Sequence, residues 1–110
     1  MHVTIDGRRH SGPPPIWNGL LCSRFCWQAI KLAEMTRLSG PHVVEKLHDA
    51  YAFAMLAESH VTVHLDGAAG IAYIDLFSCK DFDSEAFAAL CINTFNIRDV
   101  RVAVLKRGLP

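Results

Sequence analysis

Residues 60–65 alternate strictly between polar and apolar side chains, and this pattern limits the possible folds more than any other segment. Polar and apolar side chains follow one another there in the order His60, Val61, Thr62, Val63, His64 and Leu65. Successive side chains of a β-strand point to opposite faces of its sheet. The alternation therefore predicts a strand with one face in the core and the other face polar.

Other segments have the composition of strands and turns. Strands are expected at residues 2–6, 71–79 and 98–105. Residues 50–57 form an apolar run, which predicts a buried strand. The segment at 66–70, Asp-Gly-Ala-Ala-Gly, is typical of a turn.

Two segments carry helical patterns. From Leu20 to about Ser39, apolar residues recur at the three-and-four spacing of one helix face, and Gly40-Pro41 is a typical stop signal. A second helix is expected from Asp83-Ser84, because Asp83 is a favourable N-cap residue. The expected inner stripes contain Cys22, Phe25, Cys26, Ala29 and Ala33 in the first helix and Phe87, Leu90 and Cys91 in the second.

The order of these segments predicts the fold class. A strand, a helix, several strands, a second helix and a final strand form an α/β fold, a two-layer sandwich with two helices on one face of a mainly antiparallel sheet. We expect a single domain over residues 1–110. The other sheet face has no helix to cover it, so we expect a homodimer in which a second copy covers it.

Charge and hydropathy exclude several classes of protein. The chain has 11 basic and 11 acidic residues, so its formal net charge is zero. It therefore offers no electrostatic footprint for nucleic acid or for an anionic membrane surface. Neither a signal peptide nor a membrane-spanning segment is visible, which predicts a cytoplasmic protein. Residues 8–19, which include three successive prolines, are expected to form a surface loop.

The four cysteines, Cys22, Cys26, Cys79 and Cys91, contain no Cys-x-x-Cys pair. Cys22 and Cys26 lie one turn apart on the first expected helix, where free thiols pack as small apolar side chains. No histidine or carboxylate spacing completes a metal site around them. We therefore predict buried free thiols on this helix and no metal.

Polar residues with catalytic potential gather in one region. Glu58, Ser59 and His60 stand together, and His64 and Cys79 follow them. Each also has an ordinary structural role: a serine hydroxyl bonds to backbone at a strand end, a strand histidine is solvated, and a thiol is buried. Composition and periodicity alone leave the function of these residues open.

The intervals between these residues resemble those of the short prokaryotic S-adenosylmethionine decarboxylases. The resemblance is carried by LAESHVTVH at residues 56–64 and by IDLFSC at residues 74–79. In that family a Glu-Ser-His tripeptide stands five residues before a second His and twenty before a Cys. The same intervals separate Ser59 from His64 and from Cys79. The order of the expected elements and the opening His2-Val3 are also similar.

The resemblance implies a self-processing enzyme. The chain would cleave itself between Glu58 and Ser59 into a β chain, residues 1–58, and an α chain, residues 59–110. Ser59 would become a pyruvoyl group, which forms a Schiff base with the substrate amine and takes up the electrons left by decarboxylation, much as pyridoxal phosphate does. The implied activity is that of a carboxy-lyase in polyamine and spermidine biosynthesis, acting as a homodimer of processed protomers.

The same resemblance implies roles for two further residues. His64 would be the base in self-cleavage, and Cys79 would be the proton donor in turnover. Five residues of straight strand span about 17 Å and place Ser59 and His64 on opposite faces. The two can act together if the chain bends after Ser59 or if the partner subunit contributes, and the sequence leaves both open. Strain at the Glu58–Ser59 bond is also expected at a self-cleaving site.

The four positions after the second histidine depart from the family pattern and bear on the substrate. Family members usually have a Thr or Ser, an aromatic residue, Pro and a ribose-binding Glu there, whereas this chain has Leu65, Asp66, Gly67 and Ala68. Residues 44–49 also lack an aromatic residue for the adenine clamp. Asp66 suits a cationic substrate, although it is equally a plain turn residue. We therefore favour L-ornithine or L-arginine as the substrate, with S-adenosylmethionine as the alternative.

A function of another class also fits the pattern. A non-catalytic α/β module that dimerises or binds a small ligand needs the same fold. Such a module would keep an unbroken chain, whereas the enzyme would be cut at Glu58-Ser59.

Overall fold

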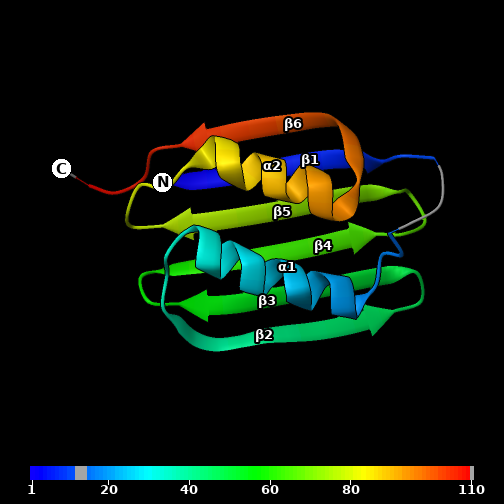
Figure 1. Cartoon of the computed structure of the whole chain (residues 1–110), viewed down its shortest axis with the longest axis horizontal. Helices are drawn as coiled ribbons and strands as arrows, with labels where there is room; N and C mark the ends of the chain where they lie inside the picture. The colour runs from blue at the N-terminus through cyan, green and yellow to red at the C-terminus, as the bar shows by residue number, and fades with distance from the viewer. Residues whose placement is uncertain (12–14, 110) are drawn as a thin grey trace.

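The computed structural model describes residues 1–11 and 15–109, which form an antiparallel six-stranded sheet with two helices on one face (Figure 1). The strand order across the sheet is β2-β3-β4-β5-β1-β6. The elements are β1 (His2–Arg9), α1 (Gly19–Leu32), β2 (Arg37–Lys46), β3 (Asp49–Leu56), β4 (Ser59–Asp66), β5 (Ile71–Ser78), α2 (Ser84–Phe95) and β6 (Ile97–Leu105). This arrangement confirms the predicted two-layer α/β sandwich.

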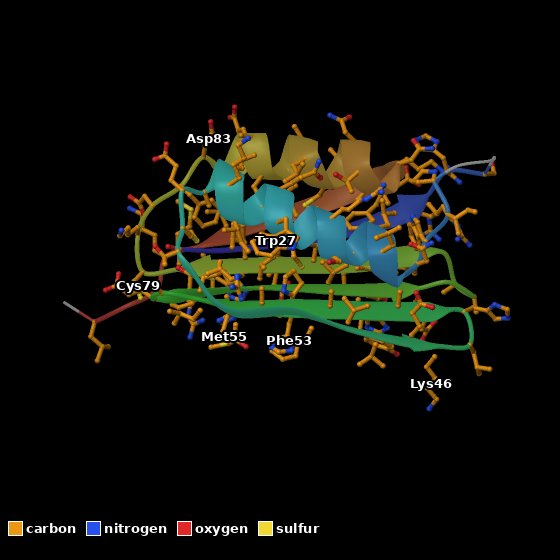
Figure 2. All side chains as sticks on the ribbon, turned by 60° about the horizontal axis from the view of Figure 1, so that its bottom comes forward. Trp27, Lys46, Phe53, Met55, Cys79 and Asp83 are labelled. Carbon is orange, nitrogen blue, oxygen red and sulfur yellow. The ribbon has the colours of Figure 1, made fainter. Side chains whose placement is uncertain are left out.

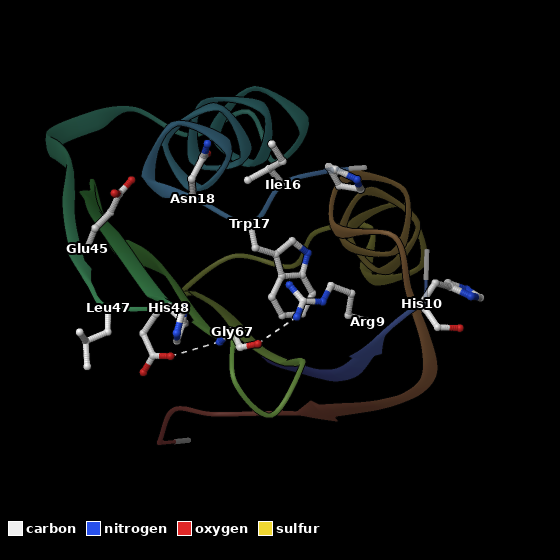
Figure 3. Close-up of a pocket in the computed structure, with 12 residues that line it drawn as sticks. Arg9, His10, Ile16, Trp17, Asn18, Glu45, Leu47, His48 and Gly67 are labelled. Atoms are coloured by element: carbon white, nitrogen blue, oxygen red, sulfur yellow. Dashed lines mark hydrogen bonds between the residues drawn. The ribbon is translucent and has the colours of Figure 1, made fainter. Parts of the chain in front are cut away.

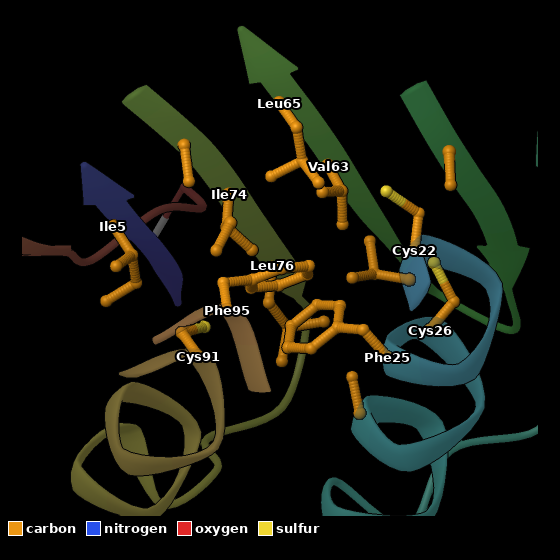
Figure 4. Close-up of a cluster of buried hydrophobic side chains, with 14 of the residues drawn as sticks. Ile5, Cys22, Phe25, Cys26, Val63, Leu65, Ile74, Leu76, Cys91 and Phe95 are labelled. Carbon is orange, nitrogen blue, oxygen red and sulfur yellow. The ribbon is translucent and has the colours of Figure 1, made fainter. Parts of the chain in front are cut away.

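The core lies between the helices and the covered face of the sheet (Figure 4). The centroid of the Phe25 ring, from α1, lies 6.0 Å from that of Phe87 and 5.0 Å from that of Phe95, both from α2. All three rings are fully buried. Burial of a phenylalanine side chain contributes about 1.5–3 kcal/mol, so this contact holds both helices to the same core.

The strand predictions are largely confirmed. The alternation over 60–65 is the inward and outward alternation of β4, whose apolar side chains are at most 2% exposed. The strands expected at 2–6, 71–79 and 98–105 correspond to β1, β5 and β6. The second helix also begins as predicted, because Asp83 Oδ1 accepts the N–H of Ala86 at 3.0 Å.

Helix α1 ends at Leu32, and its predicted extension to Ser39 is wrong. Its start is capped by Asn18, whose side chain accepts a backbone N–H of the first turn. After its end, Glu34 adopts a left-handed conformation with φ 54°. The N–H of the following residue then donates to the Ile30 carbonyl at 3.1 Å, as in a Schellman motif. The helix is therefore terminated by a glutamate in a position that usually holds glycine.

The chain beyond this helix forms the edge strand β2, which contains the expected stop signal. Gly40-Pro41 lies inside β2, where the peptide bond is cis and the pairing with β3 shifts in register. Proline is tolerated at this place because the outer N–H groups of an edge strand have no ladder partner. The stop signal therefore ends no helix.

The face of the sheet away from the helices is uncovered. The run at 50–57 is wrong as a fully buried strand, because β3 buries its alanines on the helix side and presents Tyr51, Phe53 and Met55 on the open face. Phe53 and Met55 are each 45% exposed, and Figure 2 shows them pointing away from the helices. Tyr73 from β5 is 41% exposed on the same face. We call this surface the open face.

The loop between β1 and α1 is described only in part. The loop expected over 8–19 begins late, because its first two residues belong to β1, and residues 12–14 lie outside the described part of the chain. Trp17 fixes its far end. The Trp17 Nε1–H donates to the Phe95 carbonyl at 2.9 Å, and the Arg9 guanidinium lies 4.7 Å from the centroid of the indole ring.

Candidate active site

The hairpin between β3 and β4 holds the Glu58–Ser59 bond at one end of the sheet. Leu56 and Ser59 are register partners, so Ala57 and Glu58 form a two-residue turn. Glu58 adopts φ 64°, a left-handed conformation that costs a non-glycine residue about 1 kcal/mol. Backbone strain is thus present beside the bond, but it is not unique, since Leu47 in the β2–β3 turn has φ 55°.

The carbonyl group of this bond is fixed by the end of β5. The Cys79 backbone N–H donates to the Glu58 carbonyl oxygen at 3.1 Å. A donor aimed at a carbonyl oxygen stabilises the negative charge that develops there when a nucleophile attacks the carbon. The Glu58 carbonyl is therefore polarised in the folded chain.

The Ser59 hydroxyl lies on the helix-facing side of the sheet, in a polar contact with Ser78. Ser59 is 7% exposed, and its Oγ lies 3.2 Å from Ser78 Oγ and 3.4 Å from the Ala57 carbonyl. Ser78 is 1% exposed, and its Oγ also accepts the Lys80 N–H at 2.9 Å. Two buried hydroxyls therefore pair beside the strained turn. Sequence analysis missed Ser78, whose only signal is its place next to Cys79.

The end of β5 also brings Cys79 to this site through its backbone. Cys79 directly follows the strand and is exposed, so the interpretation of Cys79 as a buried thiol is wrong. Figure 2 shows Cys79 at the end of the sheet opposite Lys46. The structure thus brings Cys79 next to Glu58 and Ser59, although Cys79 is twenty residues beyond Ser59 in the sequence.

His64 lies away from this group within one chain. It is on the open face, whereas the Ser59 side chain is on the helix side, and the five residues between them span about 17 Å of straight strand. The His64 ring stacks on Tyr51 with 4.4 Å between centroids, and its centroid lies 5.7 Å from that of Tyr73. β4 contains neither the bend nor the bulge that would bring His64 back to Ser59.

Asp66 has the structural role of a turn residue. Its Oδ1 accepts the Ala69 N–H at 3.0 Å, and its carbonyl accepts the Gly70 N–H at 2.8 Å. The position lies seven residues along β4 from Ser59, about 23 Å in a straight strand. The two do not meet within one chain, so the structure gives no support to a shared binding site there.

Three of the four cysteines are buried free thiols. Cys22, Cys26 and Cys91 are fully buried, as predicted for the first two. Burial raises the pKa of Cys22 and of Cys26 to about 12, and it raises the pKa of Cys91 as well. These thiols therefore remain protonated and unreactive near neutral pH.

Two hollows lie outside the Ser59 end. One of about 340 Å³ is on the open face, and Tyr51, His64, Tyr73 and Asp75 line it. A cavity of about 900 Å³ lies at the opposite end of the strands, where Trp17, Glu45 and His48 line it (Figure 3). Across residues 1–11 and 15–109, no cluster of three potential metal ligands is present, and no helix is long and apolar enough to cross a membrane.

Comparison with known proteins gives consistent matches. The family model described as S-adenosylmethionine decarboxylase matches residues 2–108. The S-adenosylmethionine decarboxylase proenzyme of Aquifex aeolicus is 31% identical over 83 residues, and that of Archaeoglobus fulgidus is 28% identical over 82 residues. Each alignment covers 74% of this chain; they span 61% of the Aquifex protein and 73% of the Archaeoglobus protein.

The fold has a match among solved structures. The crystal structure of the adenosylmethionine decarboxylase from Aquifex aeolicus superposes with a TM-score of 0.76 and 21% sequence identity. The superposition covers 99% of this chain and 90% of that one. The residues that the family model matches, 2–108, include the whole Ser59 end of the sheet. This chain belongs to the S-adenosylmethionine decarboxylase family.

Proposed function

We propose that this chain is a pyruvoyl-dependent decarboxylase that cleaves itself between Glu58 and Ser59. One observation carries the proposal: the Glu58 carbonyl accepts the Cys79 N–H at 3.1 Å while the neighbouring Ser59 hydroxyl is buried against Ser78. A nucleophile beside a polarised carbonyl is what an acyl shift requires. Family membership supports the same activity.

Self-cleavage takes place in three steps, which are an acyl shift, an elimination and a hydrolysis. The Ser59 Oγ loses its proton and attacks the Glu58 carbonyl carbon, the C–N bond breaks, and the freed nitrogen takes up a proton, which gives an ester. A base then removes the hydrogen from Ser59 Cα, and the Cβ–Oγ bond breaks. Glu58 leaves as a carboxylate, and residue 59 becomes a dehydroalanine. Water then hydrolyses this residue, its nitrogen leaves as ammonia, and residues 59–110 begin with a pyruvoyl group.

The chain's own residues have separate parts in this sequence. Cys79 N–H stabilises the oxyanion of the first step, and Ser78 orients the Ser59 hydroxyl. The pyruvoyl carbonyl supplies an electron sink for the decarboxylation. The Cys79 thiol, which is exposed, donates a proton to the substrate carbon after carbon dioxide leaves.

His64 acts across a homodimer in this proposal. A second copy covers the open face, whose apolar side chains include Phe53 and Met55 at 45% exposure. The two-fold axis lies between the two facing sheets, runs perpendicular to β4 and passes near Thr62, so it reverses the strand direction. It therefore sets His64 of the partner subunit over the Ser59 end of the first protomer. The base then approaches from the face opposite Ser59 Oγ, where the Cα hydrogen is removed.

Coexpression of two defective chains tests this arrangement. A Ser59→Ala chain supplies His64, and a His64→Ala chain supplies Ser59, so only a mixed dimer has one complete site. We expect the His64→Ala chain to be cleaved in the mixture and to stay largely uncleaved alone. Lack of cleavage in a mixture that forms mixed dimers would place the base in the same chain as Ser59.

S-adenosylmethionine is the substrate we propose. The relatives named above carry that name, and the expectation of a basic amino acid rested on missing aromatic rings and on Asp66. The open face offers aromatic rings at Tyr51, Phe53 and Tyr73, which sequence analysis did not place there. Asp66 is engaged in its turn. These observations favour a nucleoside over a small cationic amino acid.

L-ornithine or L-arginine stays a second candidate because of one observation. The ribose-binding glutamate of the family is replaced by Ala68, so the nucleoside lacks one hydrogen-bonding partner. Carbon dioxide release from S-adenosylmethionine, L-ornithine and L-arginine, measured in parallel, separates the two. We expect turnover of S-adenosylmethionine that borohydride treatment abolishes. Turnover of a basic amino acid alone would reverse the assignment, and no turnover of any would favour a non-catalytic module.

A further inference from the structure

A carboxylate lies behind His64 on the open face. Asp49, at the start of β3, accepts the Gly67 N–H on Oδ1 at 3.1 Å and the Tyr51 hydroxyl on Oδ2 at 3.1 Å. The same Oδ2 lies 3.9 Å from His64 Nε2. Tyr51, whose hydroxyl donates to Asp49, also provides the ring on which His64 stacks. The three side chains therefore form one connected unit.

The two nitrogens of His64 differ in their surroundings. Nε2 is buried and has no hydrogen-bond partner, although the side chain as a whole is 42% exposed. Asp49 Oδ2, slightly beyond hydrogen-bond distance, is the anionic atom facing Nε2. A buried N–H that faces a carboxylate is favoured over a buried lone pair that faces one. This environment leaves Nδ1 as the nitrogen free to accept a proton.

We propose that Asp49 is a positioning residue for His64, which holds the imidazole as the Nε2–H tautomer with Nδ1 free to accept a proton. Tyr51 packs the ring in place and fixes the Asp49 oxygen. The link to self-cleavage rests on the proposed function, but the tautomer does not. Sequence analysis passed over Asp49 because its signal, a carboxylate two residues before the strand partner of His64, exists only once the register of β3 and β4 is known.

The other charged groups around His64 are distributed over all the packed strands. Asp66 is on its own strand, Tyr73 and Asp75 are on β5, and His42 on β2 lines the same hollow. Asp75 provides an internal control, because it lies 3.8 Å from His2 Nε2 rather than beside His64. Asp49 therefore lies beside His64, and Asp75 lies beside His2.

Nuclear magnetic resonance of the imidazole nitrogens tests the proposal without relying on activity. A uniformly ¹⁵N-labelled Ser59→Ala chain stays unbroken and is compared with the same chain carrying Asp49→Asn or Asp75→Asn. Asparagine keeps an oxygen for the Gly67 N–H but presents an N–H group to His64 Nε2 in place of a carboxylate oxygen. With the imidazole neutral, we expect the Nε2–H tautomer of His64 in the parent chain and a shift toward the Nδ1–H tautomer in Asp49→Asn.

The control is expected to move the other histidine. Asp75→Asn changes the tautomer of His2 and leaves that of His64 unchanged. The proposal is overturned if His64 is mainly the Nδ1–H tautomer in the parent chain, or if its tautomer is the same with and without Asp49. In a chain with Ser59 intact, Asp49→Asn is expected to slow cleavage about tenfold. Cleavage at a rate that Asp49→Asn does not change would retain the proposed function and reject the positioning role.

Discussion

The two ends of strand β4 are built in different ways. At the Ser59 end, a strained two-residue turn lies against two buried hydroxyls, and a backbone N–H fixes the Glu58 carbonyl. At the His64 end, the side chains are partly exposed aromatic rings and carboxylates on the open face. One end is organised around a peptide bond and the other around an imidazole.

The contrast separates the groups that the proposed function requires. The Ser59 end holds a buried hydroxyl beside a carbonyl that accepts a backbone N–H, whereas the His64 end holds an imidazole with a carboxylate behind it. In the proposed dimer, one sheet reversed over the other would bring the two ends together. Substitutions at each end therefore have different expected effects.

The largest effect is expected for Ser59→Ala. Removal of the hydroxyl leaves no nucleophile, so cleavage and decarboxylation both fall to background. Gel analysis of the purified chain and carbon dioxide release measure the two. Ser23→Ala, on helix α1, is a matched control that is expected to cleave normally. Decarboxylation by the Ser59→Ala chain would show that no pyruvoyl group is needed.

Cys79→Ala is expected to separate the two activities. The Cys79 contact with the Glu58 carbonyl is made by backbone, so cleavage should continue. Turnover loses a general acid and is expected to fall about 10²–10⁴-fold. The rates of cleavage and of decarboxylation, measured on the same preparation, separate the two effects. An equal loss of cleavage and turnover would mean that the thiol acts before the pyruvoyl group forms.

Ser78→Ala is expected to slow cleavage about fivefold. The substitution removes the oxygen 3.2 Å from Ser59 Oγ, a contact of about 1 kcal/mol, while the backbone of β5 stays in place. Ser78→Thr keeps the hydroxyl and should restore most of the rate. The time course of cleavage after cell-free synthesis measures it. Normal cleavage by the alanine variant would leave Ser78 with a packing role only.

The smallest effect is expected at Asp66. Asparagine keeps the oxygen that accepts the Ala69 N–H, so Asp66→Asn should change neither stability nor turnover appreciably. Asp66→Ala loses that bond and is expected to lower the free energy of unfolding by about 0.5–1 kcal/mol. Urea unfolding and steady-state assays are the measurements. A selective loss of L-ornithine or L-arginine turnover in Asp66→Asn would restore Asp66 as a substrate contact.

Local patterns predicted most of the fold. The alternation of β4 and the Asp83 cap each depend on neighbouring residues, so the sequence displays them directly. The end of α1 is not visible in the sequence in this way, because Glu34 terminates the helix in a conformation for which glycine is the usual signal. The open face of β3 was missed for a related reason: small alanines and large rings are both apolar, so their alternation does not stand out.

The candidate site was predictable only where family intervals mark it. Ser59 and Cys79 are fixed by such intervals, and the structure brings them together. Ser78 and Asp49 acquire their contacts from strand register, which pairs residues far apart in sequence. The position of His64 relative to Ser59 was predicted as a difficulty, and it remains one within a single chain.

Mass spectrometry of the purified wild-type chain under denaturing conditions is the decisive measurement of self-cleavage. Cleavage at Glu58–Ser59 gives two fragments, residues 1–58 and residues 59–110, with the second beginning in a carbonyl that borohydride reduces and Edman reagents do not attack. A single unbroken chain with a free amine at its start would rule out self-cleavage and the pyruvoyl group.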